Sequence, residues 1–133
     1  MKVEAFLCDA ATVREGLLHM LGAGVTRIHG PAFPARMNVQ LAMMLTLAPV
    51  EAQLHHKLNV IVQTDDGVKI AEINAEFGVG QPVQAAQPGA PIAVPMILDL
   101  RLVGVPKAGN YSVEILVDSQ HAKGLPFAVV TKL

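Results

Sequence analysis

The sequence predicts an all-β protein, specifically an immunoglobulin-like antiparallel β-sandwich of eight or nine strands. Short stretches alternate apolar and polar residues at period two, which is typical of strands with one buried face. Turn residues separate these stretches at regular intervals, and no segment shows helical periodicity over more than two turns. The chain has 133 residues, of which 52% are apolar. We therefore expect one domain, residues 1–133, with enough apolar surface to bury a core.

The last hairpin, residues 107–131, shows the pattern most clearly. After a bend that contains Gly109, apolar residues alternate with polar ones from Tyr111 to Val117, and the alternation restarts at Leu125. A tyrosine that opens the penultimate strand is typical of the tyrosine corner of immunoglobulin-like sandwiches. We therefore expect structural roles for Gly109 and Tyr111, with the tyrosine hydroxyl bonded to the backbone upstream.

The first third of the chain predicts short strands and a hairpin. Residues 3–8 are apolar on both alternating faces, which indicates a strand covered on both sides or packed against a neighbour. Residues 10–14 are expected to begin a helical turn that Gly16 ends. Residues 17–21 and 25–29 are interpreted as a hairpin, because the small residues between them permit positive φ. A proline-containing connector follows.

A long strand is predicted at residues 36–47. A helix is the alternative, because alanine, methionine and leucine are good helix formers. We favour the strand because the next segment, residues 54–63, also alternates and is followed by an Asp-Gly pair at Asp66-Gly67, a strong hairpin signal. The inward row of the long strand is Val39, Leu41, Met43, Leu45 and Leu47.

The second half of the chain contains one irregular strand and one regular strand. The apolar positions change parity after Ile70, so we expect a β-bulge near Ala71-Glu72. Residues 78–91 hold several prolines, glycines and glutamines and are predicted to form the longest loop. Residues 92–102 alternate cleanly, and Pro95 within them marks an edge strand or a bulge, because proline has no N–H to donate.

Composition argues against several classes of partner. The formal net charge of −1 gives no reason to expect nucleic acid or an anionic membrane. The longest nearly uncharged run, residues 37–50, is shorter than the roughly 20 residues of a membrane-spanning helix. Cys8 is the single cysteine, so no intramolecular disulfide forms, and no secretory signal opens the chain. The expected compartment is the cytoplasm.

The residues that could carry chemistry form no recognisable motif. Histidines occur at positions 19, 29, 55, 56 and 121 without the spacing of a zinc site, and adjacent strand residues point to opposite faces. There is no glycine-rich phosphate loop and no nucleophile motif. Asp9 and Asp118 lie at strand ends, where turn or capping roles are expected unless the fold brings them together. We therefore predict no catalytic residue, no bound cofactor and no metal site.

One outward-facing row is unusually apolar. Met44 falls on the outward row of its strand, and Ile61, Ile97 and Val103 fall on the outward rows of theirs. If these strands are neighbours, the four side chains form a contiguous apolar patch, and such patches mark interaction sites. The four residues are therefore the predicted interaction residues.

Several short motifs occur along the chain: the opening residues 3–11, Gly16-Leu17-Leu18, residues 21–24 with Arg27-Ile28, Pro31-Ala32-Phe33-Pro34, and the closing pattern from Gly109 to Phe127. Together they resemble a family of short, single-domain bacterial proteins of unknown function. The similarity spans essentially the whole chain. It implies a compact β-rich bacterial protein and carries no catalytic residues with it.

Three functional hypotheses follow. The first is a non-enzymatic module that acts through protein contacts, as a homo-oligomer or as a subunit of a larger assembly. The alternative is a small-ligand-binding sandwich with its site near loop 78–91, because sandwich loops cluster at the ends of the fold. The third is an enzyme that gathers histidine and aspartate from separate strands. A separation of more than about 10 Å between every carboxylate and either His56 or His121 would remove it.

Overall fold

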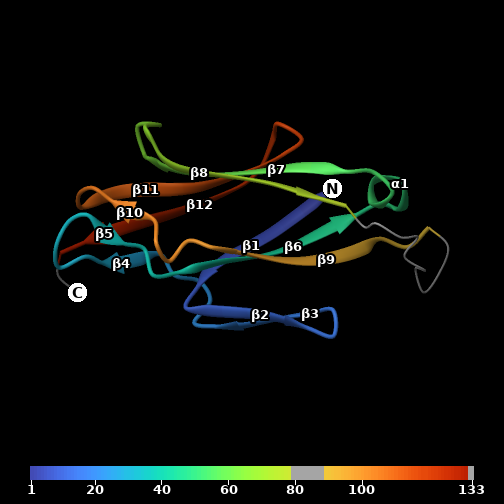
Figure 1. Ribbon diagram of the computed structural model, residues 1–133, viewed down its shortest axis with the longest axis horizontal. Helices are drawn as coiled ribbons and strands as arrows, with labels where there is room; N and C mark the ends of the chain where they lie inside the picture. Colours follow the sequence, from blue (N-terminus) through green and yellow to red (C-terminus); the bar gives the residue numbers. More distant parts are fainter. Residues whose placement is uncertain (79–88, 132–133) are drawn as a thin grey trace.

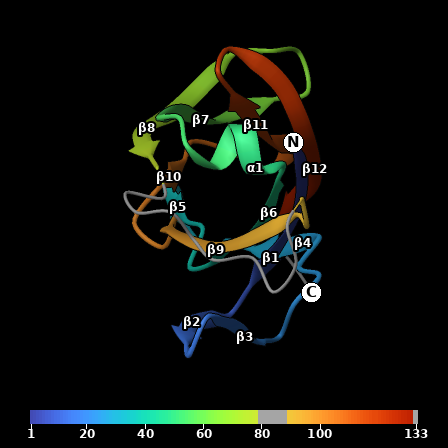
Figure 2. The ribbon, with the colours of Figure 1, turned by 90° about the vertical axis from the view of Figure 1, so that its right-hand side faces the viewer.

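The computed structural model describes residues 1–78 and 89–131. Two sheets face each other across the core, and a separate hairpin lies outside the smaller sheet (Figure 1, Figure 2). The smaller sheet has three antiparallel strands in the order β1-β6-β9. The bounds are Lys2–Cys8 for β1, Gln40–Leu47 for β6 and Ile92–Asp99 for β9.

The larger sheet has five strands in the order β4-β12-β11-β7-β8. All its pairs are antiparallel except β4 with β12, which run parallel. The bounds are Arg27–His29 for β4, His56–Thr64 for β7, Lys69–Phe77 for β8, Gly109–Val117 for β11 and Gln120–Val130 for β12.

Three smaller units complete the described part of the chain. Strands β2 (Ala10–Arg14) and β3 (Leu17–Leu21) form the separate hairpin, which we call the arm. Strands β5 (Ala35–Arg36) and β10 (Gly104–Val105) make a two-residue pair. The short helix α1 (Pro49–Ala52) connects β6 of one sheet to β7 of the other.

The core lies between the inward rows of the two sheets. All five residues of the inward row predicted for residues 36–47 are at most 4% exposed, and Val60 and Ile115 of the larger sheet are equally buried. Each such aliphatic side chain contributes about 1.5–3 kcal/mol by leaving water. One continuous cluster therefore holds the two sheets together.

The structure confirms an all-β protein but contains more strands than the eight or nine predicted. The described residues form twelve strands. Residues 36–47 do not form one strand, because Asn38 takes a positive φ of 55° and separates β5 from β6. β5 and β10 have two residues each, which is too short for a period to be seen in the sequence.

Two predictions in the first third are wrong. Residues 10–14 form strand β2 rather than a helical turn, and residues 17–21 pair with β2 rather than with residues 25–29. The turn that joins β2 to β3 consists of Glu15 and Gly16, which both have positive φ, as a type I′ turn requires. Glutamate is not a usual residue for that position, so the sequence gives no clear hairpin signal there.

Other local predictions hold. Strands β7 and β8 form the hairpin predicted from Asp66-Gly67. The register of that pair slips at Ile70, one residue before the predicted bulge. Pro95 lies in β9, an edge strand of its sheet. Most of the predicted loop 78–91, namely residues 79–88, lies outside the described residues.

The two predicted structural residues open strand β11. The Tyr111 hydroxyl donates a hydrogen bond of 2.6 Å to the carbonyl oxygen of Lys107, upstream as predicted, and the ring stacks on Phe127. Gly109, with φ of 155°, is the first residue of the strand. This corner fixes the connection into β11 at the edge of the core.

Candidate functional site

The arm packs against the outer face of the three-stranded sheet. It lies outside β6 and β9 in both views of the ribbon (Figure 1, Figure 2) and contacts both strands. One arm face, with Ala11, Leu18 and Met20, is half-buried, whereas the opposite face is exposed. The arm therefore acts as a partial third layer on this side of the molecule.

Polar contacts fix the base of the arm. The Oε1 atom of Gln40 accepts the backbone N–H of Ala11 at 2.8 Å, and the N–H of Asp9 bonds the carbonyl of Leu21 at 3.0 Å. Cys8 is fully buried at this junction, and its thiol donates to the carbonyl of Gln40. Burial and the nearby Asp9 carboxylate raise the pKa of Cys8.

Four large apolar side chains are exposed on β1 and the arm. The exposed fractions are 47% for Phe6, 43% for Val13, 60% for Leu17 and 72% for Leu21. We call these four residues the arm surface. Phe6 also borders a groove of about 350 Å³ between β1 and β12, lined by Val25, Leu125 and Pro126 among others. Leu17 and Leu21 lie on the outer face of the arm, whereas Val13 lies on its inner face, opposite Leu18.

The structure brings together only two of the four predicted interaction residues. Met44 and Ile97 are diagonal neighbours on the outer face of the three-stranded sheet, and both are half-buried there. Ile61 lies on the outer face of the other sheet, opposite Glu72 and Glu114. Val103 follows β9 and packs against the core. The four residues therefore do not form one patch.

Sequence reasoning missed Leu17 and Leu21. The segment Leu17–Leu21 is apolar at both parities except for His19, which is the signal for a strand with two apolar faces. The same pattern also fits half of an ordinary hairpin, and only the pairing with β2 shows that the face with Leu17 and Leu21 lacks a cover.

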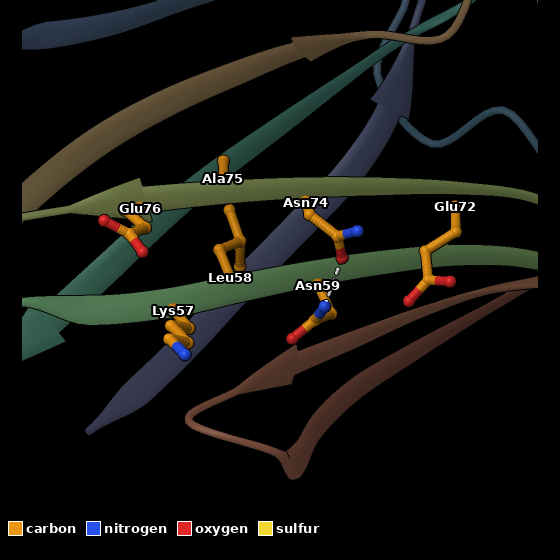
Figure 3. A pocket seen from close by; sticks show the side chains of 7 residues that line it. All are labelled: Lys57, Leu58, Asn59, Glu72, Asn74, Ala75 and Glu76. Atoms are coloured by element: carbon orange, nitrogen blue, oxygen red, sulfur yellow. Dashed lines mark hydrogen bonds between the residues drawn. The ribbon is translucent and has the colours of Figure 1, made fainter.

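A second candidate site is a polar cleft of about 480 Å³ on the outer face of β7 and β8 (Figure 3). Lys57 lies opposite Glu76, and the Asn59 side-chain amide donates to the Asn74 side chain. Glu72 closes one end and pairs with Lys69 at 2.7 Å. The cleft presents amide and charged groups on a flat, open sheet.

A buried histidine forms a third cluster. His56 is 6% exposed; its Nδ1 lies 2.6 Å from Oδ2 of Asp118, and its Nε2 lies 2.7 Å from the carbonyl oxygen of Glu51. Its ring stacks on Phe77 at 5.2 Å between centroids. The Asp118 hydrogen bond raises the pKa of His56, although burial acts against it.

Asp118 thus has the turn role expected of it and is not brought together with Asp9, which lies between β1 and β2.

The second histidine of the enzyme hypothesis also contacts a carboxylate. His121 Nε2 lies 2.5 Å from Oε2 of Glu114 on the outer face of the five-stranded sheet. The distance criterion therefore does not remove the enzyme hypothesis. Neither histidine has the environment of a typical catalytic base. Both ring nitrogens of His56 already have hydrogen-bond partners, and the contact between His121 and Glu114 is exposed to water.

Two further observations concern the residues that the structure describes. No three of their histidine, cysteine and acidic side chains are grouped so that they could hold a metal ion. No helix among them is long and apolar enough to cross a membrane.

Comparison with known families gives one match over nearly the whole chain. Residues 4–130 match the model of a family described as "Family of unknown function (DUF6941)". The chain belongs to this family. The resemblance to a family of unknown function is thereby confirmed, and membership of DUF6941 assigns no activity.

Other comparisons add little. No curated protein matches the chain. One solved structure, Pseudomonas fluorescens alkylpurine DNA glycosylase AlkC bound to DNA containing an abasic site analog, is similar with a TM-score of 0.41 and 12% identity. That match covers 95% of this chain but only 30% of the glycosylase. We draw no argument from a similarity this weak.

Proposed function

We propose that the protein is a non-enzymatic interaction module that assembles with a second copy of itself through the arm surface. The observation that carries the proposal is the exposure of Leu17 and Leu21, at 60% and 72%, on the outer face of a hairpin that already covers a sheet. Four of the ten large apolar side chains exposed in the described residues lie on β1 and the arm.

Energetics support a cover for this surface. A two-stranded hairpin is marginally stable on its own, and the arm packs through only one of its faces. Burying an exposed leucine contributes about 1.5–3 kcal/mol, so a partner that covers Leu17, Leu21 and Phe6 gains several kcal/mol before the cost of association. A second copy presents the same surface, as a two-fold symmetric interface requires.

The finer architecture is also a proposal: an immunoglobulin-like sandwich. The neighbours β12-β11-β7-β8 follow the order of strands G, F, C and C′ in that fold, and β6 with β9 corresponds to strands B and E. The Tyr111 hydrogen bond supports it. Val113, two residues after Tyr111, takes the place of the second disulfide cysteine and is fully buried.

Light scattering of matched variants tests the assembly. We expect the wild-type protein to show at least twice the 14.1 kDa of one chain at micromolar concentration. Leu17→Glu with Leu21→Glu should lower the mass to 14.1 kDa while the circular-dichroism spectrum stays β-rich. The control is Val68→Glu with Leu102→Glu, which are 60% and 76% exposed outside the arm.

Two results would refute the assembly proposal. One is a wild-type protein that is strictly monomeric at micromolar concentration. The other is a control variant, Val68→Glu with Leu102→Glu, that dissociates the assembly as fully as the arm variant does.

Met44→Glu is a further variant, and it should also lower the measured mass because Met44 lies on the face beneath the arm.

A second candidate function is small-ligand binding in the cleft on β7 and β8 (Figure 3). Its volume of about 480 Å³ lies in the range of ligand sites, and amide and carboxylate groups converge in it. We expect polar neutral ligands such as small saccharides to shift the side-chain amide signals of Asn59 and Asn74 in NMR spectra. No shift at millimolar ligand would count against this candidate.

The remaining expectations stay proposals as well. A protein partner, rather than nucleic acid or a membrane, suits a contact surface that is apolar and a chain of net charge −1. A reducing compartment such as the cytoplasm suits a single, fully buried thiol at Cys8. We propose no cofactor for either candidate function.

A further inference from the structure

Each nitrogen of the His56 ring faces a hydrogen-bond acceptor. One acceptor is the Asp118 carboxylate at 2.6 Å, and the other is the Glu51 backbone carbonyl at 2.7 Å. A neutral imidazole carries a single N–H, so one of its two contacts would set a lone pair against an oxygen. Only the imidazolium ion donates to both acceptors.

The same contacts could also be made with the proton on Oδ2 of Asp118 and a neutral His56 ring. The Asp118 carboxylate opposes that arrangement, because its Oδ1 atom accepts the backbone N–H of Lys57 at 2.9 Å while Oδ2 faces His56. The hydrogen bonds from His56 and then from Lys57 lower the pKa of Asp118. The carbonyl oxygen of Glu51 has no proton to give. The two acceptors around the ring, together with the lowered pKa of Asp118, therefore favour charged His56 beside charged Asp118.

These contacts join four segments at one end of the molecule. Glu51 belongs to helix α1, His56 begins β7, Asp118 lies in the β11–β12 turn, and Phe77 ends β8. Asp118 and His56 are 62 residues apart in the chain. The helix has only four residues and cannot be stable in isolation.

We propose that His56 is a pH-sensitive latch: its imidazolium fastens helix α1 to the β11–β12 turn, and loss of its proton releases the helix from the end of the five-stranded sheet. Deprotonation removes one of the two donated hydrogen bonds and the charge that Asp118 faces. The β-sheets do not depend on this contact and stay folded.

The charged groups around the ring favour the imidazolium. The turn supplies the Asp118 carboxylate, and α1 supplies the Glu51 carboxylate, which also pairs with the Met1 ammonium at 3.2 Å. Along the chain the neighbours are His55, which precedes β7, and Lys57 within β7, and β8 supplies the uncharged Phe77 ring. The two carboxylates are thus opposed by the terminal ammonium and by the exposed Lys57.

The sign of the pH dependence follows. The pKa of His56 is raised above its ordinary value of 6.5 in the latched state. The latch therefore stabilises the helix fully below pH 6.5 and loses this contribution as the pH rises through the raised pKa. Protection of the helix should fall about tenfold for each unit by which that pKa exceeds 6.5.

NMR of the full chain between pH 5 and pH 9 tests the latch. Ring nitrogen signals should show an N–H at both Nδ1 and Nε2 of His56 at pH 6.5, with a midpoint above that value. Hydrogen exchange at the amides of Ala52, Gln53 and Leu54, corrected for its intrinsic pH dependence, should accelerate through the same midpoint. The amide of Leu45 in β6 should show no such acceleration.

Two variants separate the latch from a merely structural contact. Asp118→Asn should lower the midpoint of His56 and flatten the pH dependence at α1. The matched control, Glu114→Gln, breaks the exposed His121 pair and should leave both readouts unchanged. The latch is refuted if His56 is neutral below pH 6.5, or if protection at α1 does not change across the midpoint. If Asp118→Asn fails to fold, the titration of His56 in the wild-type protein is sufficient to test the latch.

Discussion

The outer faces of the two sheets differ although their inner faces are alike. On the five-stranded sheet the outward positions of β7 and β8 include Lys57, Asn59, Glu72, Asn74 and Glu76, all of them polar. The outward positions of the three-stranded sheet include two residues, Cys8 and Ala42, that are completely buried, with Met44 and Ile97 half-buried.

This difference shows what each sheet needs around it. Water satisfies the polar outer face of an antiparallel sheet, so the five-stranded sheet needs no further layer. The apolar outer face of the three-stranded sheet needs a cover, and the arm supplies part of it. The arm in turn exposes Leu17 and Leu21 on its own outer face, beside the polar Thr12, Arg14 and His19, so the three-stranded sheet is covered by a layer that is itself partly apolar towards water.

The largest expected effect comes from placing a charge beneath the arm. Ala42→Asp puts a carboxylate at a position that is 0% exposed, without a partner, and should cost about 3–5 kcal/mol. Ser112→Asp, on the outer face of the larger sheet, should change stability by no more than about 0.5 kcal/mol. Urea denaturation measures both, and equal losses would mean that the outer faces do not differ.

An intermediate effect is expected where the two sheets are alike. Leu45→Ala in β6 and Leu58→Ala in β7 each leave a cavity in the shared core and should each cost about 2–5 kcal/mol. The measurement is again the midpoint and slope of urea unfolding. A loss confined to one of the two variants would show that the sheets do not share one cooperative core.

The smallest effect is expected for the exposed contact between Glu114 and His121 on the polar face. Glu114→Gln removes the carboxylate that contacts His121, whose side chain is 59% exposed, and should cost about 1 kcal/mol or less. The loss should shrink further at high salt, because ions screen exposed charges. Thermal unfolding at low and high salt checks this, and a large, salt-independent loss would contradict it.

The inner rows of the fold could be predicted from the sequence, because the residues of a strand that face the core are apolar and lie at every second position. Leu41, Met43 and Leu45 are fully buried as expected. Tyr111 could be placed for a similar reason, since its neighbourhood combines a bend with the start of a strand. Such signals are local, and the residues that generate them are adjacent in the chain.

Strand partners and the site were harder to predict because they depend on distant contacts. The turn at Glu15 lacks the usual residues of a type I′ turn, so the sequence predicts a helical turn in place of β2 and the wrong partner for β3. The contact of His56 with Asp118 spans 62 residues and leaves no periodic trace. The outward row of Met44 was found, but not the arm that lies over it.

The position of Cys8 gives this protein a natural reporter. The single thiol is sealed at the base of the arm with no solvent exposure and in its protonated form. A thiol reagent can modify it only when the hairpin lifts or the chain unfolds. The speed of labelling therefore reads out how often that hairpin detaches, and a bound companion molecule would slow the reaction without touching the sulfur.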